Sequence, residues 1–202
     1  VTGDFNCSRN SLISLFEGPT EVNDFDCSYN QLKNLSYAPK EVKGNFDCSN
    51  NLIDSVKGMP RTVKGYFNCS TNKIATLKGG PKYVDATFDC SQNLIDRLTG
   101  GPVSVGQDYL CFKNNLTDLD GVADEIGFDL VSDIRLNHLS STFNEEEKTW
   151  RYKGSEVISH IYKPIVALTN VDDISRWLRK HEIKNFTILK DNSVNVHGDV
   201  KL

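Results

Sequence analysis

The chain has 202 residues, of which 38% are hydrophobic and 25% charged, and its net charge is −4. A chain of this length can bury a sizeable core, and its acidic balance argues against a nucleic-acid-binding protein. No stretch approaches the run of ~20 apolar residues that a membrane-spanning helix requires. We therefore expect neither a nucleic-acid partner nor a membrane.

A segment of 20 or 21 residues is repeated along the first part of the chain. Each copy carries the motif Phe-[Asp/Asn]-Cys-Ser-x-Asn, except a degenerate sixth copy at 109–114. The six cysteines mark the copies, at positions 7, 27, 48, 69, 90 and 111. A fixed period of this length is typical of a solenoid. In chain order, each copy predicts a short parallel strand around Phe-x-Cys, then a turn, then an extended return that contains a regularly spaced proline.

A coil of 20 residues leaves no room for a helix, so the predicted array is mainly β, with parallel strands and no convex helices. The asparagine that ends each motif falls where the chain leaves the strand. We expect its amide to satisfy the backbone of the turn and to form a continuous ladder from coil to coil. The cysteines are expected to point inward as a column of free thiols, without disulfides or zinc. We expect no metal and no cofactor, and the free thiols indicate a cytoplasmic protein.

The composition changes near residue 127, because both tryptophans and all four histidines follow it. We divide the chain into a repeat array at 1–127 and a C-terminal cap with a small α+β module at 128–202. Residues 121–139 are interpreted as the array end, since the next strand, Phe128-Asp129-Leu130, comes too early for the repeat. An open solenoid end must be covered.

The remaining elements of the module follow from local patterns. Residues 140–148 are polar and predict a loop or a helix start, and 156–168 predict one edge strand or two short strands. Residues 170–181 have the spacing of an amphipathic helix, and 186–189 with 194–196 predict a hairpin. The final segment, 196–202, repeats the pattern of residues 1–7. We expect it to pair in parallel with a repeat strand, and such pairing between chains would cause self-association.

The repeat F-[DN]-C-S-x-N-x-[LI]-x-x-[LV]-x-G-x-P resembles the short leucine-rich repeats found in proteins of tailed phages and bacteria. The resemblance covers about residues 1–126 and implies a leucine-rich-repeat solenoid, phage-encoded and acting on a host or virion protein. Some related bacterial effectors carry a ubiquitin-ligase domain with a cysteine nucleophile. No cysteine follows Cys111 in this chain, so that activity is not implied.

Between the inward-facing residues lie side chains that we expect on the concave side of the sheet. Six of them are acidic and none is basic, which favours a basic protein partner. The alternative is that these polar residues only form a solvated ladder, which their regular recurrence favours. The candidate binding residues are Asp4, Asp24, Asp26, Asp47, Tyr66, Asp89 and Asp108. Leu110 and Phe112 replace polar residues of the repeat, and we expect them to contact the cap at the array end.

No catalytic constellation is visible, because no nucleophile motif accompanies any of the scattered histidines. We therefore expect a non-enzymatic scaffold for protein–protein interaction. One alternative is that the array delivers a small enzymatic or nucleic-acid-processing module at 140–202, with His160, Trp150, Arg151 and Tyr152 as the residues to inspect. Another is that the protein is a structural building block of a particle.

Overall fold

The structure is a computed structural model that describes residues 3–136, 139–158, 186–188 and 194–196. The chain forms two compact units, Val1–Ile158 and Ser159–Leu202. Within the described residues, no helix is long and apolar enough to cross a membrane.

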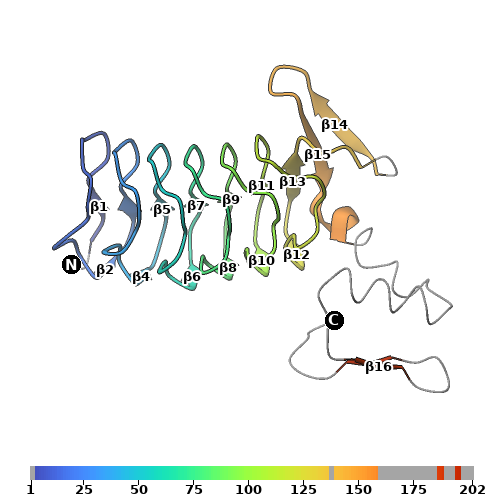
Figure 1. The fold of residues 1–202 in the computed structure, drawn as a ribbon, viewed down its shortest axis with the longest axis horizontal. Helices are drawn as coiled ribbons and strands as arrows, with labels where there is room; N and C mark the ends of the chain where they lie inside the picture. The colour runs from blue at the N-terminus through green and yellow to red at the C-terminus, as the bar shows by residue number, and fades with distance from the viewer. Residues whose placement is uncertain (1–2, 137–138, 159–185, 189–193, 197–202) are drawn as a thin grey trace. The chain divides into compact units, whose positions relative to one another are not determined.

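The first unit is a parallel-strand solenoid in which each repeat forms one coil (Figure 1). Its principal sheet contains one short strand from each copy, and neighbouring strands pair in register, as in Phe5 with Phe25 and Phe46 with Phe67. These strands are β1 (Phe5–Asn6), β3 (Phe25–Asp26), β5 (Phe46–Asp47), β7 (Phe67–Asn68), β9 (Phe88–Asp89), β11 (Tyr109–Leu110) and β13 (Asp129–Ser132). The predicted mainly β solenoid without convex helices is confirmed.

The returning half of each coil also contains a two-residue strand, which the sequence pattern predicted only as extended backbone. These strands form two smaller parallel sheets, β2-β4 and β6-β8-β10-β12. Their second residue is valine or isoleucine in every case, and its side chain is buried. The strands are β2 (Glu21–Val22), β4 (Glu41–Val42), β6 (Thr62–Val63), β8 (Tyr83–Val84), β10 (Ser104–Val105) and β12 (Glu125–Ile126).

The interior consists of columns of the same residue type stacked from coil to coil. The aromatic column runs from Phe5 to Tyr109, with neighbouring ring centroids between 5.0 and 5.9 Å apart. All six cysteines are free, and all but Cys7 are buried. Burial raises the pKa of every one of these thiols, to about 12 for Cys111. A neutral thiol in such a column packs as a small apolar side chain.

The predicted asparagine ladder is present and joins each coil to the preceding one. At Asn51, Nδ2 donates to the carbonyls of Cys48 at 3.2 Å and of Cys27, one coil earlier, at 3.0 Å. Its Oδ1 accepts from the backbone N–H of Leu32 at 3.0 Å. The residue before each asparagine has a positive φ of 53–55°, which turns the chain out of the strand. One side chain thus satisfies backbone groups of two coils that the turn would leave unpaired.

The repeat continues one coil further than its sequence motif suggests. Leu130 pairs with Tyr109 and Val131 with Leu110, so Leu130 and Ser132 occupy the phenylalanine and cysteine positions of a coil. The interpretation that a strand at Phe128 comes too early is wrong, because Leu130 and not Phe128 aligns with the repeat. Phe128 is instead 60% exposed.

An antiparallel hairpin completes the principal sheet after β13 (Figure 1). Strand β15 (Thr149–Lys153) pairs with β13, and β14 (Ser141–Asn144) pairs with β15. The predicted loop or helix start at 140–148 is therefore wrong over 141–144. Residues 154–158 are helical, so the strand predicted from residue 156 is also wrong at its beginning.

In the second unit, β16 (Phe186–Ile188) pairs antiparallel with β17 (Val194–Val196), which confirms the predicted hairpin. The amphipathic helix predicted at 170–181 lies outside the described residues. The parallel pairing predicted for 196–202 concerns residues that, beyond Val196, also lie outside them.

Candidate functional site

We call the strand face the set of side chains that alternate with the inward-facing ones along the seven parallel strands of the principal sheet; within this set Ser28, Ser49, Ser70, Ser91, Phe112 and Val131 are buried. It has three rows. The front row precedes the aromatic position of each strand, the middle row lies between the aromatic and cysteine positions, and the back row follows the cysteine position. The front row is Asp4, Asp24, Asn45, Tyr66, Thr87, Asp108 and Asp129. The middle row is Asn6, Asp26, Asp47, Asn68, Asp89, Leu110 and Val131. The back row is Ser8, Ser28, Ser49, Ser70, Ser91, Phe112 and Asp133.

The acidic residues of the middle row hold the turn that follows each strand. Asp26 Oδ1 accepts from the backbone N–H of Ser28 at 2.9 Å and from its hydroxyl at 2.7 Å. Asn68 Oδ1 accepts the same two bonds from Ser70, at 3.0 and 2.7 Å. Because asparagine and aspartate perform this role equally, the turn does not require a negative charge.

A second oxygen of the middle-row carboxylates receives an amide from a neighbouring coil. Asn6 Nδ2 donates to Asp26 Oδ2, and Asn68 Nδ2 donates to Asp47 Oδ2, each at 3.1 Å. Asp89 differs, because its neighbours in the row are Asn68, whose amide donates to Asp47, and the apolar Leu110. In the part of the chain that the structure describes, Asp89 is hydrogen-bonded only to Ser91. Burial raises the pKa of Asp89, with a smaller contribution from the charge of Asp47. The hydrogen bonds from Ser91 lower this pKa but do not cancel the rise.

The front row forms a ladder of its own, in which each acid or amide caps a backbone N–H of the next coil. Asp4 Oδ1 accepts from Asp24 N at 3.2 Å, and Asp24 Oδ1 accepts from Asn45 N at 2.7 Å. Asn45 Oδ1 in turn accepts from Tyr66 N at 3.0 Å. The ladder stops at Tyr66 and resumes only where Asp108 Oδ1 accepts from Asp129 N at 3.0 Å.

A shallow pocket of about 250 Å³ opens where the front-row ladder stops. It forms because the large ring of Tyr66, which is 38% exposed, is followed by the smaller Thr87 and Ala86. Burial and the nearby carboxylates, Asp47 first, raise the pKa of Tyr66. The lining residues are Tyr66, Phe67, Asn68, Ala86, Thr87, Asp89 and Gln107.

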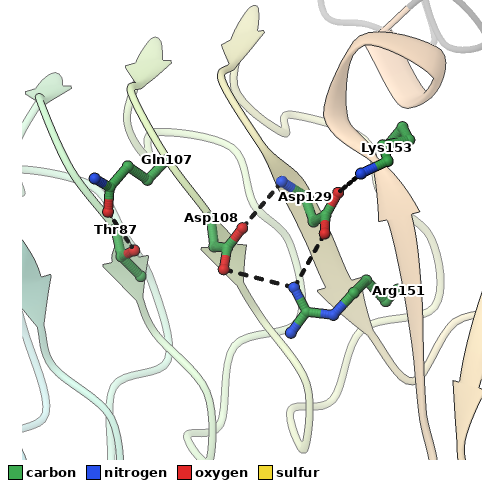
Figure 2. A network of polar contacts seen from close by, with 6 residues as sticks. All are labelled: Thr87, Gln107, Asp108, Asp129, Arg151 and Lys153. Atoms are coloured by element: carbon green, nitrogen blue, oxygen red, sulfur yellow. Dashed lines mark hydrogen bonds and ion pairs between the residues drawn. The ribbon is translucent and has the colours of Figure 1, made fainter.

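Beyond this pocket, the acids of the strand face bind two cations from the hairpin (Figure 2). Arg151 Nη1 lies 3.5 Å from Asp108 Oδ2 and 3.2 Å from Asp129 Oδ2. Lys153 Nζ lies 3.2 Å from Asp129 Oδ1. A single guanidinium thus bridges carboxylates of two adjacent coils. Nothing in the sequence pattern predicts these contacts.

The structure places all the predicted binding residues on the strand face, in two separate rows. Asp4, Asp24, Tyr66 and Asp108 belong to the front row, whereas Asp26, Asp47 and Asp89 belong to the middle row. The two apolar candidates lie on or beside β11, which is followed by β13 and not by the end of the sheet. Leu110 is half-buried beside its partner Val131, and Phe112 is 9% exposed.

Three of the residues proposed for an enzymatic module have structural contacts in β15. The Trp150 ring lies 4.5 Å from that of Phe143, and the Tyr152 hydroxyl donates to the Ile134 carbonyl at 3.0 Å. Arg151 makes the ion pairs described above. His160 lies outside the described residues. Within them, no group of three or more histidine, cysteine, aspartate or glutamate side chains could hold a metal ion.

Comparisons with protein-family models, with curated proteins and with solved structures found no match to this chain.

Proposed function

We propose that the protein is a non-enzymatic scaffold whose strand face binds a basic surface of a protein partner. Seven carboxylates occupy the front and middle rows, and none of the three rows contains a lysine or arginine. Clustered charge of one sign raises the encounter rate with a partner of the opposite sign.

One observation favours binding over a purely structural ladder. At three positions of the two rows, Asn6, Asn45 and Asn68, an asparagine makes the same capping bonds as an aspartate elsewhere. The bonds to backbone N–H groups therefore do not need the carboxylates, and their charge is available for recognition. The ion pairs of Arg151 and Lys153 support this proposal, because they demonstrate that acids on this face accept cationic side chains.

The decisive experiment removes four charges and keeps the side-chain bonds to backbone N–H groups. The variant Asp24→Asn, Asp26→Asn, Asp47→Asn, Asp89→Asn loses the amide bonds to the second carboxylate oxygens but should still fold, because asparagine already makes the backbone bonds at equivalent positions. In a salt-controlled pull-down from a host lysate, we expect it to lose about tenfold or more of the affinity for the captured partner.

A charge-matched control carries Glu21→Gln, Glu41→Gln, Asp54→Asn and Asp96→Asn, four exposed positions outside the strand face. This control should capture the partner as the wild type does. Capture at the wild-type level by both variants would exclude the strand face as the binding surface. An equal loss of capture in both would show that binding depends only on the net charge of the protein.

We also propose that the array is related to the short leucine-rich repeats of tailed phages and bacteria, and that the protein is phage-encoded and cytoplasmic. The period, the asparagine ladder and the position of the proline support the relationship. The buried free thiols support a reducing compartment, since such a compartment keeps thiols reduced.

A further inference from the structure

We propose that the pocket bounded by Tyr66, Asp89 and Gln107 binds an arginine side chain of the partner. This inference rests on the proposed function, and it specifies which residues bind the partner and which chemical group of the partner they bind. Unlike the rest of the strand face, the pocket interrupts both ladders at once.

The electrostatics of Asp89 favour a cation in the pocket. Its carboxylate lacks the amide that Asp26 and Asp47 each receive from an adjacent coil, and Leu110 on its other side offers no donor. Partial burial without a cation disfavours the charged form of this carboxylate, which is why its pKa is raised. A guanidinium in the pocket would supply the missing donors and the opposite charge together.

The ring of Tyr66 forms one wall of the pocket. A guanidinium stacks on an aromatic ring through its planar face while its edge donates to a carboxylate. The same chain places a guanidinium over an aromatic ring elsewhere, since Arg9 lies 4.5 Å from the ring centroid of Tyr29 and Arg135 lies 4.9 Å from that of Trp150. Tyr66 also lies in the field of Asp47, Asp26 and Asp24, which attracts a cation to its ring.

The backbone beside the pocket offers a hydrogen-bond donor to a bound peptide. The N–H groups of Asp24, Asn45 and Tyr66 each receive a front-row side-chain oxygen from the preceding coil. In the described coils, Thr87 receives none, because the side chain before it in the row is Tyr66. Thr87 and Asp89 are two residues apart on one face of a strand, about 7 Å. An extended peptide can therefore place a carbonyl at Thr87 N–H and its arginine side chain at Asp89.

The binding of arginine can be measured with a defined probe, the acetylated and amidated tripeptide Gly-Arg-Gly, titrated into the ¹⁵N-labelled full chain. We expect saturating chemical-shift changes in the millimolar range, centred on the amides of Asn68, Thr87, Asp89 and Gln107. The tripeptide with citrulline in place of arginine, which lacks the charge, should bind at least about tenfold more weakly. The lysine tripeptide should bind several-fold more weakly, because it lacks the planar fork.

Matched variants locate the site. Asp89→Asn should weaken binding of the arginine tripeptide about tenfold while the protein stays folded, since asparagine holds the same turn at Asn68. Tyr66→Thr, which copies the next coil, should weaken it several-fold. Asp26→Asn, which removes a charge of the same row that has its amide partner, should change it less than about twofold.

The proposal is overturned if citrulline or lysine binds as well as arginine, if shifts spread evenly over all coils, or if Asp26→Asn and Asp89→Asn have equal effects. Absence of binding in the wild type overturns it as well. None of these results contradicts the scaffold function, which is tested by a different readout, capture of the partner by the fourfold variant. Conversely, a fourfold variant with full capture removes the scaffold proposal even where the tripeptide binds.

Discussion

The interior and the strand face of the solenoid are built from the same coils, yet they differ in how strictly they repeat. In the interior, phenylalanine, cysteine and asparagine recur with only one substitution before the last coil, Tyr109 for phenylalanine. On the strand face, the residue type changes in the front and middle rows over the three coils from Tyr66 to Leu110. The interior residues repeat because identical side chains stack from coil to coil. The outward residues vary where one part of the strand face differs from the rest.

The largest expected effect that tests this difference comes from the cysteine column. Burial raises the pKa of the thiols, so the folded protein keeps protons that the unfolded chain loses above about pH 8.5. Stability from this source is complete below that pH and falls as the pH rises. Each buried thiol should then lower the free energy of unfolding by up to about 1.4 kcal/mol per pH unit.

Urea unfolding at several pH values between about 8 and 10 measures this fall, which should reach several kcal/mol per pH unit for the five buried thiols together. Cys69→Ala should reduce the slope by one thiol's share. A midpoint that does not move with pH would contradict the buried column. Ellman titration of the unfolded, reductant-free chain should detect all six free thiols.

The next largest effect concerns the aromatic column. Phe67 is fully buried between Phe46 and Phe88, at centroid distances of 5.4 and 5.6 Å. Phe67→Ala should lower the free energy of unfolding by about 3–5 kcal/mol, because the rigid coils above and below cannot fill the cavity. The control is Tyr66→Ala, one residue away on the strand face, which should cost less than about 1 kcal/mol. Similar losses of stability in both variants would show that the interior and the strand face contribute equally to the free energy of unfolding.

The asparagine ladder should show a smaller but still large effect. Asn51→Ala removes three hydrogen bonds to carbonyls and one acceptor for Leu32 N, all of them buried. We expect a loss of about 3 kcal/mol in denaturant unfolding, since the backbone groups are left without partners. Asn23→Ala, at an exposed position of a returning turn, should stay within about 0.5 kcal/mol of the wild type. A neutral Asn51→Ala would mean that water replaces the ladder.

The smallest effect has the opposite sign and concerns an interior residue that departs from the repeat. The Tyr109 hydroxyl is buried without a hydrogen-bond partner among the described residues, and burial raises its pKa well above the usual value. Tyr109→Phe restores the repeat and should stabilise the protein by about 1 kcal/mol, measured by thermal or urea unfolding. A loss of stability would instead reveal a bound water or other partner at this hydroxyl.

The solenoid could be predicted from the sequence because its period places the same residue type at the same position of every coil. The asparagine ladder followed from the position of a polar residue at each turn. The seventh strand could not be found this way, since Leu130 and Ser132 share neither residue type with the motif. The hairpin of β14 and β15 was missed because its strands are polar and their pairing is with β13, which only the folded chain specifies.

The strand face was predictable for a related reason: residues alternate across a strand, so the outward positions follow from the inward ones. Its pocket was not, because its volume depends on the different heights of Tyr66 and Thr87 in adjacent coils. The ion pairs of Arg151 depend on the register between β13 and β15, separated by a long stretch of chain. Composition and spacing carry no information about either.

The constant register of the coils also makes the chain modular. Every coil passes its backbone hydrogen bonds and its asparagine amide to a neighbour in the same way, as between Phe25 and Phe46 and between Phe46 and Phe67. A 21-residue length such as 25–45 can therefore be duplicated or removed at the repeat boundary with little change in the surrounding interior. Such a change would alter the distance between the pocket and Asp4 by one strand spacing of about 4.8 Å. Gain or loss of whole coils can therefore change the separation of groups on the strand face in steps of one strand spacing.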